Sequence, residues 1–127
     1  TYTTATYRQA NGSTANQVDL VVGVAEVQLE LTLQAAVGNT STGITLAVAI
    51  GQDSTTTPVS NQLMTRYVIA VASRPVMPQA SVRLYPAVGR HYYVWLETSE
   101  ATGTSTWQGD NGAPTEQQSG LHGSYEG

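Results

Sequence analysis

The segment from Glu26 to Ala35 constrains the fold most, because its hydrophobic residues recur at every second position. Apolar and polar residues alternate along it: Val27, Leu29, Leu31, Leu33 and Ala35 on one side, Glu26, Gln28, Glu30, Thr32 and Gln34 on the other. Successive side chains of a β-strand point to opposite faces, whereas a helix would spread these leucines around its circumference. The pattern therefore predicts a strand with one buried and one solvated face.

Other short segments with β-branched or alternating residues predict further strands at 2–8, 18–24, 44–50, 63–72, 81–85, 90–98, 104–108 and 118–125. The segment 18–24 is almost continuously apolar, which predicts that both of its faces are covered. Polar loops are expected at 38–43 and 52–61, and the two prolines of 73–79 exclude a central strand there. Asp110 to Pro114 has strong turn chemistry, because Asn-Gly readily adopts positive φ.

About eight or nine strands exceed the mean sheet of about five or six, which favours two packed sheets. Loops of very unequal length suggest Greek-key connections. We therefore expect one antiparallel β-sandwich domain over residues 1–127, of the jelly-roll or Greek-key type. An immunoglobulin-like sandwich is less favoured, because its Cys…Trp…Cys pattern is absent.

The composition excludes several classes of function. The 127 residues include no cysteine, lysine or phenylalanine, and 43 of them are Ser, Thr, Asn or Gln. The absence of cysteine excludes disulfides, thiolate catalysis and Cys-ligated zinc. Five arginines and a net charge of −4 argue against nucleic acid, which requires clustered cations. No apolar run approaches the ~20 residues that span a bilayer, and no signal peptide is evident, so we expect no membrane insertion.

The titratable residues form no convincing catalytic or metal-binding set. His91 and His122 lie 31 positions apart, and the carboxylate pairs Glu26/Glu30 and Glu97/Glu100 fit solvated strand positions. Ser119 lacks the strand-to-helix turn that activates a serine nucleophile. We therefore expect no enzyme, no metal and no cofactor, with Glu97 and His122 as the only candidates for a residual enzyme hypothesis.

The strand at 90–98 is the most aromatic part of the sequence. Its alternation places Tyr92, Val94 and Leu96 on one face, which we assign to the core. The opposite face carries His91, Tyr93, Trp95 and Glu97, which are candidates for a surface site. Such an aromatic patch predicts a subunit interface or a sugar-stacking platform. The alternative is that a neighbouring loop or the C-terminal strand covers Trp95. Trp107, near a turn, is a second candidate for contact with a ligand or partner.

Four stretches of the chain resemble small β-structured proteins of tailed phages and gene transfer agents: Tyr7 to Asn11, Tyr85 to Glu97, Thr104 to Gly112 and Gln118 to Gly123. The resemblance is to the aromatic strand, hairpin and closing strand of head-fibre, spike, decoration or tail-tip modules. It implies an exposed virion component, often oligomeric and frequently trimeric, attached to a capsid, tail or fibre. It implies no catalytic residue.

Two functions of different classes follow from these observations. The first is a non-enzymatic structural protein on the surface of a phage-like virion, made in the host cytoplasm and assembled as a symmetric homo-oligomer, with a trimer favoured. The second is a carbohydrate- or receptor-binding module for host attachment, which would contact a host surface glycan through Trp107, Tyr93 or Trp95.

Overall fold

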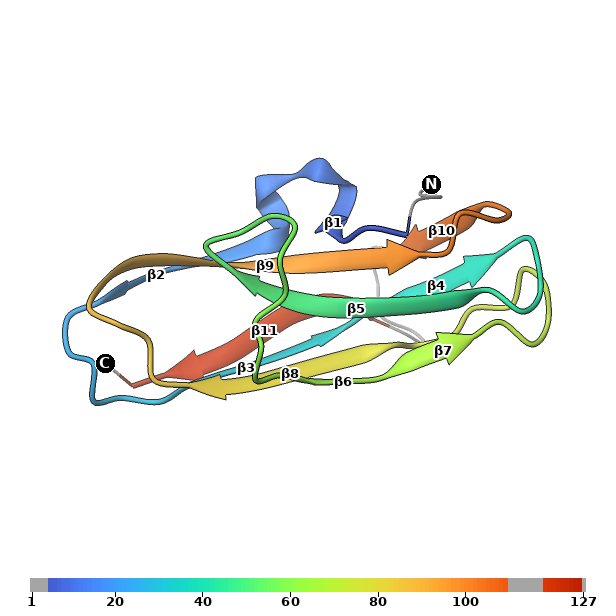
Figure 1. Cartoon of the computed structure of the whole chain (residues 1–127). Helices are drawn as coiled ribbons and strands as arrows, with labels where there is room; N and C mark the ends of the chain where they lie inside the picture. The colour runs from blue at the N-terminus through green and yellow to red at the C-terminus, as the bar shows by residue number, and fades with distance from the viewer. Residues whose placement is uncertain (1–4, 110–117, 127) are drawn as a thin grey trace.

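A computed structural model of the chain describes residues 5–109 and 118–126, and the described residues form an all-β, antiparallel fold (Figure 1). The strands are β1 (Arg8–Gln9), β2 (Gln17–Val22), β3 (Leu29–Gln34), β4 (Ala36–Asn39), β5 (Thr45–Gln52), β6 (Leu63–Met64), β7 (Arg66–Val68), β8 (Gln79–Leu84), β9 (Gly89–Ser99), β10 (Ser105–Gln108) and β11 (Gly120–Tyr125). Two single-turn 3₁₀ helices, η1 (Ala10–Gly12) and η2 (Thr14–Asn16), separate β1 from β2. The predicted antiparallel all-β fold is confirmed, and the turn expected at Asp110 to Pro114 lies outside the described residues.

The strands form two main sheets that face each other in a sandwich-like arrangement (Figure 1). One sheet has the order β1-β9-β5-β7, with β2 also paired to β9, and the other has the order β11-β3-β8-β6. Strand β4 continues from β3 and pairs with β10. Neighbouring strands in both main sheets are not consecutive in the sequence, so the chain crosses repeatedly between the sheets.

The main core lies between the two sheets and follows the alternation of β3. Leu29, Leu31 and Leu33 are buried while the residues between them are partly exposed, so the predicted orientation of this strand is confirmed. These leucines pack against the inward-facing residues of the other strands, namely Val48, Ile50, Ala80, Val82, Tyr93 and Trp95. A side chain from either sheet thus loses its solvent-exposed surface against the other sheet, which is the dominant stabilising term for such a fold.

The outer face of β5 and β9 is also covered. Ala49, Val94 and Leu96 form a second buried cluster, against which Tyr7 of the N-terminal segment packs. The loop after β5 passes so close that a Cβ on Gly51 would lie 2.6 Å from the carbonyl oxygen of Ser54. Strand β5 is therefore buried on both faces along most of its length, although its sequence alternates like a half-exposed strand.

Three expectations about the extent or coverage of strands are wrong. In the strand expected at 2–8, residues 5–7 form no strand, and pairing begins only at Arg8 in β1. The long strand expected at 63–72 is divided into β6, which pairs with β8, and β7, which pairs with β5. The segment crosses from one sheet to the other at Thr65, so no single strand can continue through it. The expected double coverage of 18–24 also fails: Val21 is 74% exposed, because β2 lies at the edge of its sheet.

Proline limits pairing in 73–79, as expected, and this segment forms no strand. Val76 still exchanges two backbone hydrogen bonds with Val37, at 2.8 and 2.9 Å.

In the described residues, no helix has the length and apolar character that crossing a bilayer requires.

Gly123 sits where β11 approaches β3 most closely, and we expect Gly123→Ala to lower the free energy of unfolding by about 2 kcal/mol or more. The added Cβ would meet the backbone carbonyl of Glu30 and the side chain of Leu31. Gly120 on the same strand has open space around it, so Gly120→Ala is the matched control, with an expected change within about 0.5 kcal/mol. Urea unfolding measures both, and equal stabilities would contradict this pairing of β11 with β3.

Candidate functional site

The aromatic residues predicted to form a surface patch on β9 instead lie inside the fold. Tyr93 is fully buried and Trp95 is 7% exposed, and both belong to the main core. Val94 and Leu96, which we assigned to the main core, form the second cluster on the opposite face. The predicted orientation of this strand is therefore wrong, and Tyr93 has no exposed surface to offer a ligand or a partner.

A buried ion pair explains why the sequence pattern predicted the wrong orientation of β9. Glu97 lies in the same row as Tyr93 and Trp95, and a carboxylate in a row normally marks the solvated face. Here Glu97 is 1% exposed, and its charge is matched by Arg8, which lies directly opposite in the register of β1 and β9. A charge can occupy a core position when it is paired in this way.

Three of the predicted residues, Trp95, Glu97 and Trp107, meet at one cleft. The cleft has a volume of about 340 Å³ and is lined by residues of β1, η1, η2 and β9 on one side and by the end of β10 on the other. Its other lining residues come from the N-terminal segment and from the end of β10: Arg8, Ala10, Asn11, Asn16, Gln108 and Gly109. Segments nearly 100 residues apart in sequence therefore build one site.

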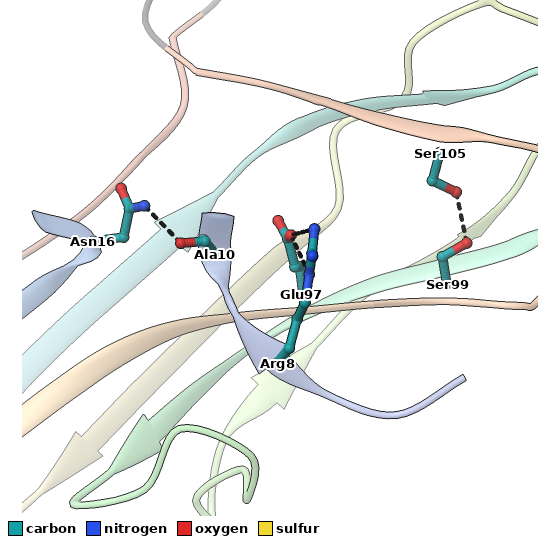
Figure 2. A network of polar contacts seen from close by, with 6 residues as sticks. All are labelled: Arg8, Ala10, Asn16, Glu97, Ser99 and Ser105. Atoms are coloured by element: carbon teal, nitrogen blue, oxygen red, sulfur yellow. Dashed lines mark hydrogen bonds and ion pairs between the residues drawn. The ribbon is translucent and has the colours of Figure 1, made fainter. Parts of the chain in front are cut away.

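Arg8 holds Glu97 from one side of this cleft (Figure 2). Its Nε and Nη2 atoms both donate to Glu97 Oε1, at 2.9 and 2.6 Å. Burial raises the pKa of Glu97 above its ordinary value, although the Arg8 hydrogen bond and charge act in the opposite direction. The pair leaves the lining of the cleft with no net charge from these two groups.

Other hydrogen bonds hold the segments on either side of this pair. Asn16 Nδ2 donates to the backbone oxygen of Ala10 at 2.8 Å, which fixes the two 3₁₀ turns together (Figure 2). Further along β9, the hydroxyls of Ser99 and Ser105 are 2.6 Å apart, and Ser105 also accepts from Asn39 Nδ2. The polar groups that flank the cleft are therefore held by the fold rather than free to rotate.

The two indole groups of the cleft share one property: neither has an acceptor for its N–H among the described residues. The Nε1 atoms of Trp95 and Trp107 are buried and have no hydrogen-bond partner among the described residues. A buried donor without an acceptor costs about 1–3 kcal/mol. Trp107 also packs against both the main core and the cluster of Val37, Ile44, Leu46 and Ile69, so its ring is held in place by both.

His91, the remaining predicted residue, lies outside the cleft and contacts Asp53 in the loop after β5. Its Nδ1 is 2.6 Å from Asp53 Oδ2 and its Nε2 is 2.9 Å from the backbone oxygen of Ala87. Both neighbours are acceptors, so both ring nitrogens donate only when the imidazole is protonated. The hydrogen bond to Asp53 raises the pKa of His91. Burial alone would raise the pKa of Asp53, but its hydrogen bonds to His91 and to the backbone of Tyr92 outweigh burial, so the pKa of Asp53 is lowered. His91 is thus a structural contact between β9 and the loop after β5.

This contact predicts a pH dependence. The raised pKa of His91 means that its contribution to stability is complete below 6.5 and is lost as pH rises through the folded-state pKa. The lowered pKa of Asp53 means that its contribution is complete above 3.8 and is lost in stronger acid. We expect Asp53→Asn, which keeps the side-chain shape, to bring the pKa of His91 down in an NMR titration and to cost less than about 1 kcal/mol at pH 5.5. An unchanged His91 pKa in that variant would contradict the contact.

The arrangement offers little for catalysis. Among the described residues that line the cleft, Glu97 is the one carboxylate, whereas glycoside hydrolysis generally uses two. Ser119 donates its hydroxyl to the backbone of Gln108 and accepts from the amide of Ala36, so it is engaged structurally. Within residues 5–109 and 118–126, no three His, Asp or Glu side chains form a group able to hold a metal ion.

Two features, one of the cleft and one of the surface, have no counterpart among the sequence predictions. Arg8 was not identified, although a lone glutamate in an aromatic strand is a signal that a cation should be sought. The exposed apolar residues Leu63 and Met64 were assigned to an ordinary strand, although they break the alternation by standing side by side. No protein-family model, curated protein or solved structure matches the chain.

Proposed function

We propose that this chain is a non-enzymatic structural module on the surface of a phage-like particle and that it assembles there as a symmetric oligomer. The observation that carries the proposal is an apolar edge formed by residues 63–68, the segment of β6 and β7. Leu63 is 78% exposed and Val68 is 55% exposed, and Met64 and Tyr67 are exposed beside them. Among the described strands, β6 pairs only with β8 and β7 only with β5.

An edge of this kind normally carries protection against pairing with other chains. Natural edge strands use lysine, proline, bulges or short length to prevent such contacts. Strands β6 and β7 have the protection of short length, with two and three residues, but the apolar edge has only one charged residue, Arg66, and the chain has no lysine. A neighbouring subunit that covers these residues would remove their exposed apolar surface from water, which favours association.

A hollow beside the edge supports contact between copies of the same chain. A cavity of about 580 Å³ lies on the outer side of β3 and β8, with Leu63 and Met64 at its wall and Thr32, Ser81 and Arg83 among its lining residues. A protruding apolar side chain next to a hollow is a surface that a second copy can complement. Repetition of such a contact closes into a symmetric ring when the rotation between subunits permits it.

The placement on a virion rests on the sequence resemblance and on the composition. The resemblance implies attachment to a capsid, tail or fibre, and among oligomeric states it favours a trimer. A surface rich in hydroxyl and amide groups on a rigid β scaffold suits repeated contacts between neighbouring subunits. The interface expected on β9 is not available, because Tyr93 and Trp95 are buried within the subunit. We therefore assign the interface to the apolar edge.

Replacing Leu63 and Met64 together by lysine tests the proposed interface. We expect this variant to be a monomer under conditions in which the wild-type chain is oligomeric, because two charges would have to be buried at each contact. Light scattering after size-exclusion chromatography measures the mass. Val21→Lys on β2, at an equally exposed valine on the opposite edge of the fold, is the matched control and should keep the wild-type mass. A lysine pair that leaves the mass unchanged, or a control that dissociates the oligomer, would refute this interface.

A further inference from the structure

The cleft between β9 and the end of β10 has a lining that the assembly of subunits does not explain. It brings together the only two tryptophans of the chain, from β9 and β10, with the Arg8–Glu97 ion pair. Its volume of about 340 Å³ lies near the lower end of the ~300–1,000 Å³ that small-molecule sites occupy. Exposed assembly residues such as Leu63 line a different hollow.

The polar groups of the cleft are those of a built site rather than of an open surface. Glu97 is almost fully buried, and both Arg8 contacts go to its Oε1 atom. Trp95 is more than nine-tenths buried, and its indole N–H has no acceptor among the described residues. The indole N–H of Trp107 on β10, which pairs with β4, is also buried and has no acceptor among the described residues. Two buried donors beside a cavity therefore lack the acceptors that buried polar groups normally have.

We propose that this cleft binds a neutral sugar residue of a glycan. A sugar ring presents apolar C–H faces that pack on tryptophan and hydroxyl groups that both accept and donate hydrogen bonds. Both indole N–H groups are buried, so a rotation of either ring toward the cleft would be needed for a sugar oxygen to accept from it. The Glu97 carboxylate and the side-chain amide oxygens of Asn11 and Asn16, which line the cleft, are acceptors for sugar hydroxyls. An anionic ligand fits less well, because Glu97 already engages the nearby guanidinium.

The size of the cleft limits what enters it. A volume near the lower end of the range for ligand sites suits one sugar ring rather than a long chain. The sugar would therefore be recognised at a terminus or branch of a glycan. This proposal rests on the cleft alone and holds for a monomer as well as for an oligomer.

Tryptophan fluorescence provides a direct test, because both tryptophans of the chain line the cleft. The probes are neutral methyl glycosides of glucose, galactose, mannose, rhamnose and N-acetylglucosamine, with methyl glucuronide as the anionic comparison. We expect at least one neutral glycoside to give a saturable change with a dissociation constant of the order of 1 mM. The absence of saturable change with every neutral glycoside, or tighter binding of the glucuronide, would overturn the proposal.

Single substitutions assign the binding to the cleft. Trp107→Phe keeps an aromatic ring but removes the unpaired N–H, and we expect it to weaken binding about tenfold. Tyr85→Phe removes a hydroxyl from an exposed aromatic residue outside the cleft and is the matched control, with unchanged affinity. Isothermal titration calorimetry of each variant with the glycoside measures both affinities. Equal affinities of the two variants would place the sugar elsewhere and refute the site.

The test is independent of the oligomeric state. The variant with lysines at positions 63 and 64 should bind the same glycoside with the affinity of the wild-type chain, since neither residue lines the cleft. Loss of glycoside binding in that variant would contradict a site contained in one subunit, whereas failure of the assembly proposal alone would leave this affinity unchanged.

Discussion

Replacing Arg8 with alanine is expected to lower the free energy of unfolding by about 3 kcal/mol at pH 7, because it leaves the buried Glu97 carboxylate without its partner. Glu97 has a side-chain exposure of 2%, so water cannot take the place of the guanidinium. Arg8 itself is 32% exposed, which places the expected loss at the lower end of what breaking a buried ion pair costs. Urea unfolding at pH 7 measures the change.

The loss should depend on pH in a defined direction. Burial already raises the pKa of Glu97 above 4.5, and removal of Arg8 removes the groups that hold it down. A raised pKa in the folded state means that stability is lost as pH rises through that value, so the penalty should be smaller at pH 4 than at pH 7. Arg83→Ala, which breaks the exposed pair with Glu30, is the matched control and should cost less than about 1 kcal/mol at either pH. A penalty for Arg8→Ala no larger than that of the control would contradict the buried pair.

Tyr93→Ala is expected to cost about 3–5 kcal/mol, the range for deleting a large aromatic side chain from a packed core. Tyr93 is fully buried between the sheets. Its hydroxyl has no hydrogen-bond partner among the described residues, and burial raises the pKa of Tyr93 to about 12. The ring therefore stabilises the fold while the hydroxyl does not.

The conservative variant separates these two contributions. We expect Tyr93→Phe to change the free energy of unfolding by less than about 0.5 kcal/mol, or to increase it, because no hydrogen bond is lost. Thermal and urea unfolding of both variants provide the measurement. A cost above about 1.5 kcal/mol for Tyr93→Phe would mean that the hydroxyl is bonded, and a small cost for Tyr93→Ala would place the residue outside the core.

The strands could be predicted from the sequence wherever one face is buried and the other solvated. Leu29, Leu31 and Leu33 identify β3 and its inward face, because polar residues separate them. Strand β9 could be located but not oriented, since both of its rows are apolar and both are covered. The outer face of β5 and β9 is covered by Tyr7 and by the loop after β5, whose packing depends on residues distant in sequence.

The candidate site could be predicted only in part for the same reason. Trp95, Glu97 and Trp107 were singled out as unusual residues, and they do lie together. Their arrangement depends on Arg8, which reaches Glu97 across 89 positions of sequence. The apolar edge could not be predicted either, because the crossing at Thr65 follows from pairing with two different sheets. Local periodicity carries no information about such distant partners.

The mass of the chain in solution tests the central claim most directly. The account predicts that native mass spectrometry of the 127-residue chain records a closed oligomer, with three times the 13.4 kDa mass of one chain as the favoured state. Amide hydrogen exchange on the same sample should then show protection over residues 63–68 that disappears when Leu63 and Met64 are replaced by lysine. A strictly monomeric chain at high concentration, with these amides exchanging freely, would contradict assembly through the apolar edge.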